Sequence, residues 1–370
     1  MGSECSRRKE KAMIAFTADN HLGIESQWGL KERGMDFMDA FESAVVGSMN
    51  SGADMIIGGD LFDSAYPPAF AVERVKMILD SARASSGMKF YGIDGNHDPA
   101  SGKWLKVCGI TPLRSDEPVE VDGKKVCGIN HMRSQDVLET LSRMADIGVK
   151  CDILVLHLAL GDLNRMGAAS DVAAHEMMPM LKSMGARMVL MGHIHIRQQV
   201  DVDGVTFLYP GSTELCSINE PKEKSVEMVD TDTWTTSPAP VLHRHVKSTV
   251  VGSEREFAAY EASVESGDKD LHDVYVAPDV ADGVKRLRDV AKEKNLLMRV
   301  HVIRGNAVER EEEIDRTAGV IGLEQAICKS FPNDSEEAGL VRAILRSPDA
   351  IRAVVDGYVK GSPEEDGKGQ

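Results

Sequence analysis

Five short apolar runs along the chain each stop abruptly at a residue type that commonly binds metal ions. Short apolar runs bounded by glycine are typical of buried parallel strands, and ligand-binding groups in open α/β sheets follow the carboxyl ends of such strands. The runs are 13–16, 55–57, 90–93, 153–156 and 188–191, and the polar residues that follow them are Asp19, His21, Asp60, Asn96, His157, His193 and His195. If the runs are neighbouring strands, we expect their ends to converge at one edge of the sheet and to form a single cleft.

Helices and hairpins are expected between these strands. Apolar residues recur at helical spacing over 37–49 and 72–79, and further helices are predicted at 134–144 and 177–184. Asp122-Gly123 and Asp203-Gly204 each lie between two alternating segments, which is the pattern of a β-hairpin. The order of strand, helix and strand predicts a large α/β domain over residues 12–245.

The rest of the chain has a different pattern. Strands are predicted at 246–251, 274–277 and 298–303, with helices at 254–266 and 281–294 between them, so residues 246–332 are expected to form a compact α+β cap domain. Residues 333–370 are expected to form a helical tail, because apolar residues recur over 340–345 and 351–358 on either side of Ser347-Pro348.

Composition limits the classes of protein that the chain can represent. No apolar stretch of signal-peptide length precedes the first strand and none is long enough to span a membrane, so we expect a cytoplasmic protein. The six cysteines lack C-x-x-C spacing, which favours reduced thiols over disulfides or a zinc cluster.

The net charge of −16 restricts any contact with a polyanion to a local basic patch. The clearest patch lies between residues 285 and 304, and its candidate DNA-binding residues are Lys285, Arg286, Arg288, Arg299 and Arg304. A solvated helix face explains the same charges equally well.

The seven strand-end residues exceed what one tetrahedral zinc ion uses. Asp60 is therefore expected to bridge two ions. The set contains no cysteine, which favours harder ions such as Mn²⁺ or Mg²⁺, with Fe²⁺ or Zn²⁺ as alternatives. Taken singly, each of these residues is as easily explained as a strand cap or a turn residue, but the recurrence at five strand ends favours a metal site.

The ordered motifs D-x-H, G-D-x-x-D, G-N-H-D, H and G-H-x-H over residues 13–215 resemble the calcineurin-like metallophosphoesterase superfamily. Within it, Asp19-Asn-His-Leu-Gly23, Gly59-Asp-Leu-Phe-Asp63 and Tyr209-Pro-Gly-Ser212 resemble the nuclease of the DNA double-strand-break repair complex, the meiotic-recombination-eleven family with its bacterial SbcD relatives. The resemblance implies an α/β four-layer sandwich, two β-sheets flanked by helices, and a metal-dependent nuclease acting on DNA.

The resemblance also implies how the ligands are shared between two Mn²⁺ ions per subunit. Asp19, His21, Asp60 and His195 would hold one ion, and Asp60, Asn96, His157 and His193 the other. In many archaeal and eukaryotic members a histidine stands where this chain has Asp63, which leaves the balance of exonuclease and endonuclease activity open. Ser212, in the Tyr-Pro-Gly-Ser turn, is a candidate DNA contact.

His97 is the predicted general acid, because it follows the ligand Asn96 without being needed as a ligand itself. A carboxylate on the far ring nitrogen would stabilise its imidazolium form, and Asp63 is the predicted partner. Asp98 is the competing candidate for this role. Asp63 is also explained as a helix cap or as the partner of a surface base.

The expected substrates are DNA ends, in single-stranded and duplex form, and the expected partner is an SMC-like coiled-coil ATPase that binds the tail. A homodimer is expected from the resemblance, with Phe37, Phe41, Phe70 and Val75 as interface candidates that equally suit a core. Two other functions remain open: a phosphoesterase for a small molecule or phosphoprotein, and a scaffold that mainly tethers DNA ends.

Overall fold

The computed structural model describes residues 13–99, 101–161, 172–218 and 220–303. The predicted tail and Arg304 lie outside these residues. Two compact units are found: one contains the described residues up to Thr249 with 263–274 and 286–300, and the other contains 250–262, 275–285 and 301–303. The domain boundaries drawn from the sequence at residues 245 and 332 stay predictions. Among the described residues, no helix is both long and apolar enough to cross a membrane.

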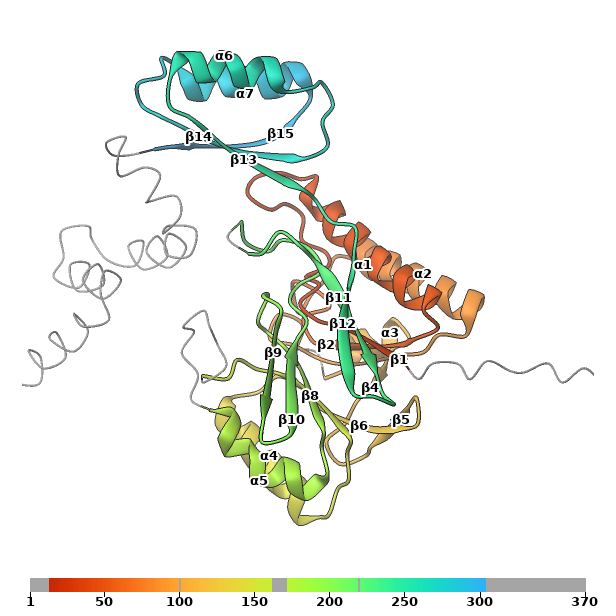
Figure 1. Cartoon of the computed structure of the whole chain (residues 1–370). Helices are drawn as coiled ribbons and strands as arrows, with labels where there is room; N and C mark the ends of the chain where they lie inside the picture. The colour runs from red at the N-terminus through yellow and green to blue at the C-terminus, as the bar shows by residue number, and fades with distance from the viewer. Residues whose placement is uncertain (1–12, 100, 162–171, 219, 304–370) are drawn as a thin grey trace, which may run out of the picture. The chain divides into compact units, whose positions relative to one another are not determined.

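Two six-stranded sheets form the body of the first unit (Figure 1). The first sheet has the order β12-β11-β1-β2-β3-β4. Its strands are β1 (Met13–Thr17), β2 (Asp54–Gly58), β3 (Phe90–Ile93), β4 (Thr111–Pro112), β11 (Ser225–Asp230) and β12 (Thr235–Pro240). The second sheet has the order β5-β6-β7-β8-β10-β9. Its strands are β5 (Val119–Val121), β6 (Lys124–Ile129), β7 (Ile153–His157), β8 (Met188–Gly192), β9 (Gln198–Val202) and β10 (Val205–Tyr209).

Helices cover the outer face of each sheet. The helices of this unit are α1 (Arg33–Asn50), α2 (Ala69–Ser86), α3 (Lys103–Val107), α4 (Ser134–Asp146) and α5 (Ala174–Met184). Figure 1 shows α1 and α2 on one side of the sheet pair and α4 and α5 on the other. The expected four-layer α/β sandwich is therefore confirmed.

The alternation of side chains along each strand explains the layers. Ile56 on β2 lies in the apolar cluster between the sheets, whereas its neighbours Met55 and Ile57 lie in the cluster under α1 and α2. On β7, Val155 faces the other sheet and Leu154 faces α4 and α5. Because successive side chains point to opposite faces and both faces are buried, each central strand is a continuous apolar run.

One expectation about the strands was wrong. The five apolar runs are not neighbours in one sheet, because β1, β2 and β3 belong to the first sheet and β7 and β8 to the second. Within each group the strands run parallel, and the two sheets pack face to face through the shared cluster. The ends still converge because the carboxyl ends of both groups lie at the same end of the sandwich.

Both predicted hairpins are present. β5 pairs with β6 and β9 with β10 in antiparallel fashion. The turn residues Asp122-Gly123 and Asp203-Gly204 all have positive φ, as a type I′ turn requires. The strands β13 (Val246–Val251), β14 (Leu271–Val276) and β15 (Leu297–Val302) form a third sheet in the order β13-β14-β15, and α6 (Glu254–Ser263) and α7 (Gly283–Lys294) connect them.

Candidate metal centre

Two loops that are far apart in the sequence are held together at the ends of β1 and β2. The backbone N–H groups of Asn20 and His21 both donate to the carbonyl oxygen of Asp60, at 2.8 and 3.0 Å, and Leu22 donates to Leu61. Asp19, His21 and Asp60 have φ angles of 53°, 47° and 49°. This left-handed conformation costs about 1–2 kcal/mol per residue. The hydrogen bonds between the loops hold these residues in it, so the site is preorganised.

Glycine is required at two positions because other groups of the site occupy the space of a side chain. A Cβ on Gly95 would lie 2.0 Å from Asp60 Oδ1, and one on Gly59 would lie 2.4 Å from His157 Nδ1. Gly59 also has a φ of +93°. The His157 ring and the Gly95 backbone therefore pack directly against the Gly59 backbone.

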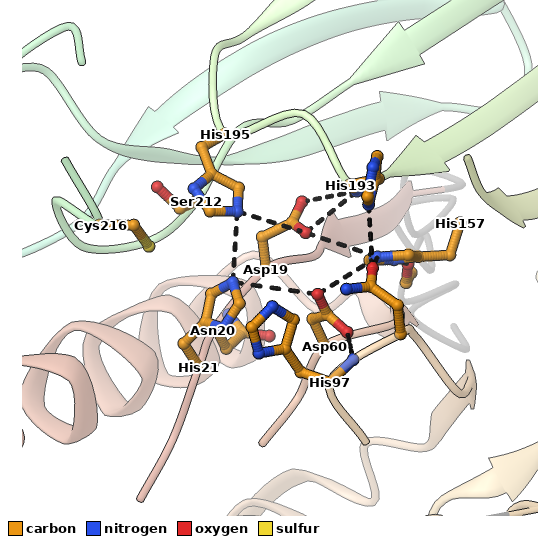
Figure 2. Close-up of polar contacts among 12 residues, drawn as sticks. Asp19, Asn20, His21, Asp60, His97, His157, His193, His195, Ser212 and Cys216 are labelled. Carbon is orange, nitrogen blue, oxygen red and sulfur yellow. Dashed lines mark hydrogen bonds and ion pairs between the residues drawn. The ribbon is translucent and has the colours of Figure 1, made fainter. Parts of the chain in front are cut away.

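His157 is fully buried and points its Nε2 atom at the carboxylates (Figure 2). Its Nδ1–H donates to the carbonyl oxygen of Gly58 at 2.8 Å, and Nε2 lies 3.3 Å from Asp60 Oδ2 and 3.0 Å from Asn96 Oδ1. Burial opposes the charged ring, but the hydrogen bond to Asp60 and the charges of Asp19 and Asp60 raise the pKa of His157 to about 9. In the absence of an ion, a proton therefore occupies the Nε2 position that a metal would take.

Asp60 lies at the centre of the site. Its Oδ1 accepts the backbone N–H of His97 at 2.8 Å, while its Oδ2 lies 3.3 Å from His157 Nε2 and 3.9 Å from His21 Nε2. Burial alone would raise its pKa, but the bond to His157 and the charges of both histidines hold the pKa of Asp60 far below the usual range. The group is therefore anionic and faces imidazoles on both sides, as a bridging ligand would.

His21 and His195 approach each other through their Nε2 atoms, which are 3.2 Å apart. The far nitrogen of each ring bonds a carboxylate: His21 Nδ1 lies 3.0 Å from Asp63 Oδ1, and His195 Nδ1 lies 3.2 Å from Glu220 Oε1. Two lone pairs cannot face each other at this distance without a cation between them. Although burial opposes it, bonds to Cys216 and Glu220 raise the pKa of His195 well above its ordinary value. A proton or a metal ion can fill this role.

His193 is held by the two remaining predicted ligands. Its backbone N–H donates to both oxygens of Asp19, at 3.0 and 3.1 Å, and its Nδ1 lies 2.9 Å from Asn96 Oδ1. Burial, and then the charge of His157, lowers the pKa of His193 to about 4. Its ring is therefore neutral at physiological pH and has a lone pair available for an ion.

The donor set fits divalent metal ions. The ligand atoms of Asp19, Asp60 and His157 lie within 4.8 Å of one another, and the same holds for His21, Asp60 and His97. Ligating histidines typically bond a carboxylate or carbonyl through the far nitrogen, as His21, His157 and His195 do here. All seven predicted ligands are brought together. Which ion each of them holds, and the choice of manganese, stay predictions.

The residues of the predicted acid–base pair lie at the rim. The His97 side chain is 44% exposed, and its Nδ1 lies 3.1 Å from the carbonyl oxygen of Asp63 but 3.7 Å from the Asp63 carboxylate. That carboxylate is closer to His21. Asp98 is buried and accepts N–H bonds from Gly95 and Phe62, and burial raises its pKa to about 6. The roles of His97 and Asp63 stay predictions.

The predicted DNA contacts differ in accessibility. Lys285 and Arg288 are exposed on α7, whereas Arg286 is half-buried. Arg299 is largely buried and lies 3.5 Å from Asp273. Ser212 is only 1% exposed, and its hydroxyl contacts Glu214 O, Glu220 and Lys224 instead of facing solvent.

Sequence reasoning missed three residues at this site. Glu220 supports His195, Cys216 lies beside His21 and His195, and His131 Nδ1 donates to the carbonyl oxygen of His157. None of them follows one of the five apolar runs. The one available signal for Cys216 and Glu220 was that they follow the Tyr209-Pro-Gly-Ser212 turn in the sequence. For His131 it was that the residue follows the strand over Lys124–Ile129.

Residues 12–197, half of the chain, match the family model described as calcineurin-like phosphoesterase. The DNA double-strand break repair protein Mre11 of Haloferax volcanii is 25% identical over 225 residues, covering 59% of this chain and 49% of that protein. Mre11 of Archaeoglobus fulgidus is 28% identical over 238 residues, covering 56% and 51%. The chain thus spans about half the length of the curated relatives it matches.

Among solved structures, a dimetal phosphatase from Danio rerio aligns at 13% identity with a TM-score of 0.35, over 59% of this chain and 92% of that one. The family match covers β1 to β8, and with them every predicted metal ligand. The chain belongs to the calcineurin-like phosphoesterase family and, within it, is similar to the Mre11 proteins.

Proposed function

We propose that this protein is a two-metal-dependent DNA nuclease that hydrolyses phosphodiesters at DNA ends and in single strands. The observation that carries the proposal is the anionic Asp60, which faces His157 on one side and His21 on the other within the family's hydrolase fold. The similarity to proteins named for DNA double-strand break repair supports DNA as the substrate.

The ligands at the site are proposed to form two ion positions that share Asp60. Asp19, His21, Asp60 and His195 are proposed to hold one ion, and Asp60, Asn96, His157 and His193 the other. When bound, two divalent ions polarise a phosphodiester and offset the negative charge that builds on its oxygens. The hydrogen bonds to Gly58, Asp63 and Glu220 fix the ring directions before substrate arrives.

His97 is proposed to protonate the leaving oxygen. If its Nδ1–H donates to the carbonyl oxygen of Asp63, its Nε2 remains available to the substrate, and the Asp63 carboxylate at 3.7 Å stabilises the imidazolium form. The partial exposure of His97 suits a group that must reach a bound strand. Asp63 would act on two histidines at once, since it also bonds His21.

The remaining parts of the proposal concern partners. The exposed Lys285 and Arg288 offer local positive charge for phosphates in an otherwise acidic chain. Homodimerisation remains part of the proposal. Of the four interface candidates, Phe37, Phe41 and Val75 are buried in the core, and Phe70 alone is exposed. The tail beyond residue 333 is proposed to bind an SMC-like coiled-coil ATPase by laying a helix into a groove.

One experiment tests the proposed activity. Purified protein with Mn²⁺ is incubated with end-labelled duplex DNA, with single-stranded DNA and, in parallel, with a generic phosphomonoester. We expect metal-dependent cleavage of DNA that Asp60→Asn abolishes. Hydrolysis of the phosphomonoester with intact DNA would favour a small-molecule or phosphoprotein phosphatase instead. Tight DNA binding without cleavage in any divalent ion would favour an end-tethering scaffold.

A further inference from the structure

The site contains a soft donor atom, a sulfur, that the family motifs do not include. The Cys216 thiol lies on the His21 and His195 side of the centre (Figure 2). Ligand atoms of these three residues all lie within 4.8 Å of one another. The residues proposed to hold the other ion, Asp60, Asn96, His157 and His193, offer oxygen and nitrogen atoms only. The two halves of the centre therefore offer chemically different donors.

The position of the thiol is fixed by the same residue that positions His195. Glu220 Oε1 bonds His195 Nδ1 and the N–H of Ser217, while Oε2 accepts the N–H of Cys216 at 3.2 Å. Gln27 Nε2 donates to the Cys216 carbonyl at 2.7 Å. The backbone on both sides of the thiol is thus anchored, so Cys216 is presented to the two histidines as a built feature of the loop.

Apart from its hydrogen bond with His195, the thiol has only a weak partner among the described residues. Its Sγ lies 3.7 Å from the carbonyl oxygen of Glu214, and an S–H group is a poor hydrogen-bond donor. A divalent cation between His21 and His195 would be a stronger partner for the sulfur. Zinc takes two histidines and a thiolate readily, whereas Mn²⁺ and Mg²⁺ prefer oxygen.

We propose that Cys216 is a ligand at the ion position formed by His21 and His195, and that it biases this position toward thiophilic ions such as Zn²⁺. On binding, a sulfur–metal bond forms and the thiol proton passes to solvent. The other position keeps its preference for harder ions, so the two ions need not be the same element. This inference rests on the proposed two-metal site and specifies which ion each half selects.

The test is metal binding by the full chain, read without any measurement of activity. Co²⁺ is titrated into the wild type, Cys216→Ser and Cys108→Ala, the last removing a thiol buried under α2 and α3 as a matched control. We expect the wild type and Cys108→Ala to show the charge-transfer absorption of a cobalt–thiolate bond. Cys216→Ser should bind the same number of Co²⁺ ions without this absorption.

Competition between Zn²⁺ and Mn²⁺ gives a second readout. Cys216→Ser should weaken Zn²⁺ binding by roughly 10–100-fold, a range that outer-shell changes already reach, and leave Mn²⁺ binding nearly unchanged. Cys216→Asp, which supplies a hard oxygen, should shift the preference toward Mn²⁺. Such a shift would show that the loss of Zn²⁺ affinity in Cys216→Ser is not a folding defect. A thiolate band that persists in Cys216→Ser, or two Co²⁺ ions bound by the wild type without the band, would overturn the inference about Cys216 and leave the proposed function intact. Failure of the wild type to bind any Co²⁺ would overturn the proposed function as well.

Discussion

The two histidine pairs of the metal centre are supported in different ways. His157 is buried at the end of β7, and its far nitrogen bonds a main-chain carbonyl of β2. His195 is 29% exposed in its side chain and depends on the Glu220 side chain, while His21 depends on Asp63. A backbone carbonyl cannot be removed by substitution, whereas a carboxylate can. The His157 half should therefore be robust, and the His21 and His195 half should be adjustable by evolution and by mutation.

The largest expected effect comes from the residue that both halves share. Asp60→Asn removes the negative charge between His157 and His21, so we expect no measurable metal-dependent hydrolysis. The fold should be retained, because Asp60 lies at a strand end outside the apolar clusters, and circular dichroism checks this. Activity in Mn²⁺ equal to that of the wild type would contradict the two-metal arrangement.

His97→Ala should give the next largest loss. The ring is proposed to donate a proton and not to hold an ion, so two ions and DNA should still bind while turnover falls by about 10²–10⁴-fold. Asp63→Asn should lose less turnover than His97→Ala. It will also weaken the positioning of the His21 ring, which bonds the same carboxylate. Single-turnover cleavage with metal binding measured in parallel separates the two effects. Unchanged activity of Asp63→Asn with an impaired Asp98→Asn would transfer the supporting role to Asp98.

Glu220→Gln is the direct test of the adjustable half. Neutralising this carboxylate, which bonds a ligand and not the ion itself, should weaken the binding of one ion by about 10–100-fold. The binding of the other ion should not change. The pKa of Glu220 falls to about 2, since the bond to His195 and the charge of Lys224 outweigh burial, so the variant also leaves a buried lysine without its anion. The double variant with Lys224→Met restores charge balance and should recover stability but not metal affinity. Equal loss of both ions in a calorimetric titration would argue that the halves are not independent.

The sequence predicted the ligands of both halves but not the carboxylate that supports His195, for a physical reason. His157, His193 and His195 follow short apolar runs, and the Asp-Gly turns are local signals, so local patterns located them. Contacts such as Glu220 with His195 join residues in a loop without periodicity. The absence of cysteine from the strand-end set favoured harder ions, with Fe²⁺ or Zn²⁺ as alternatives, yet folding places Cys216 at the site.

The division into two sheets was equally hidden from the pattern. Ile56 and Val155 lie in the same apolar cluster between the sheets, but a buried strand has the same sequence pattern in either sheet because both of its faces are apolar. Local alternation therefore predicts a strand and not its neighbours. The family motifs implied two sheets, but the apolar runs alone suggested one.

The smallest expected effect concerns the pH dependence of metal binding. The pKa of His157 is raised to about 9, so at neutral pH without metal its Nε2 carries a proton that an ion must displace. Raising the pH from 7 to 8 should therefore strengthen binding at this half by up to about tenfold, and binding should release a proton. Without metal the sign for stability is opposite: a histidine whose pKa is raised on folding stabilises the fold below its unfolded value near 6.5, and this contribution is lost as the pH rises through 9. Calorimetry in buffers of different ionisation enthalpy counts the proton, and thermal melts without metal give the stability. His157→Gln should remove both dependences, and a pH-independent affinity in the wild type would show that no proton competes with the ion.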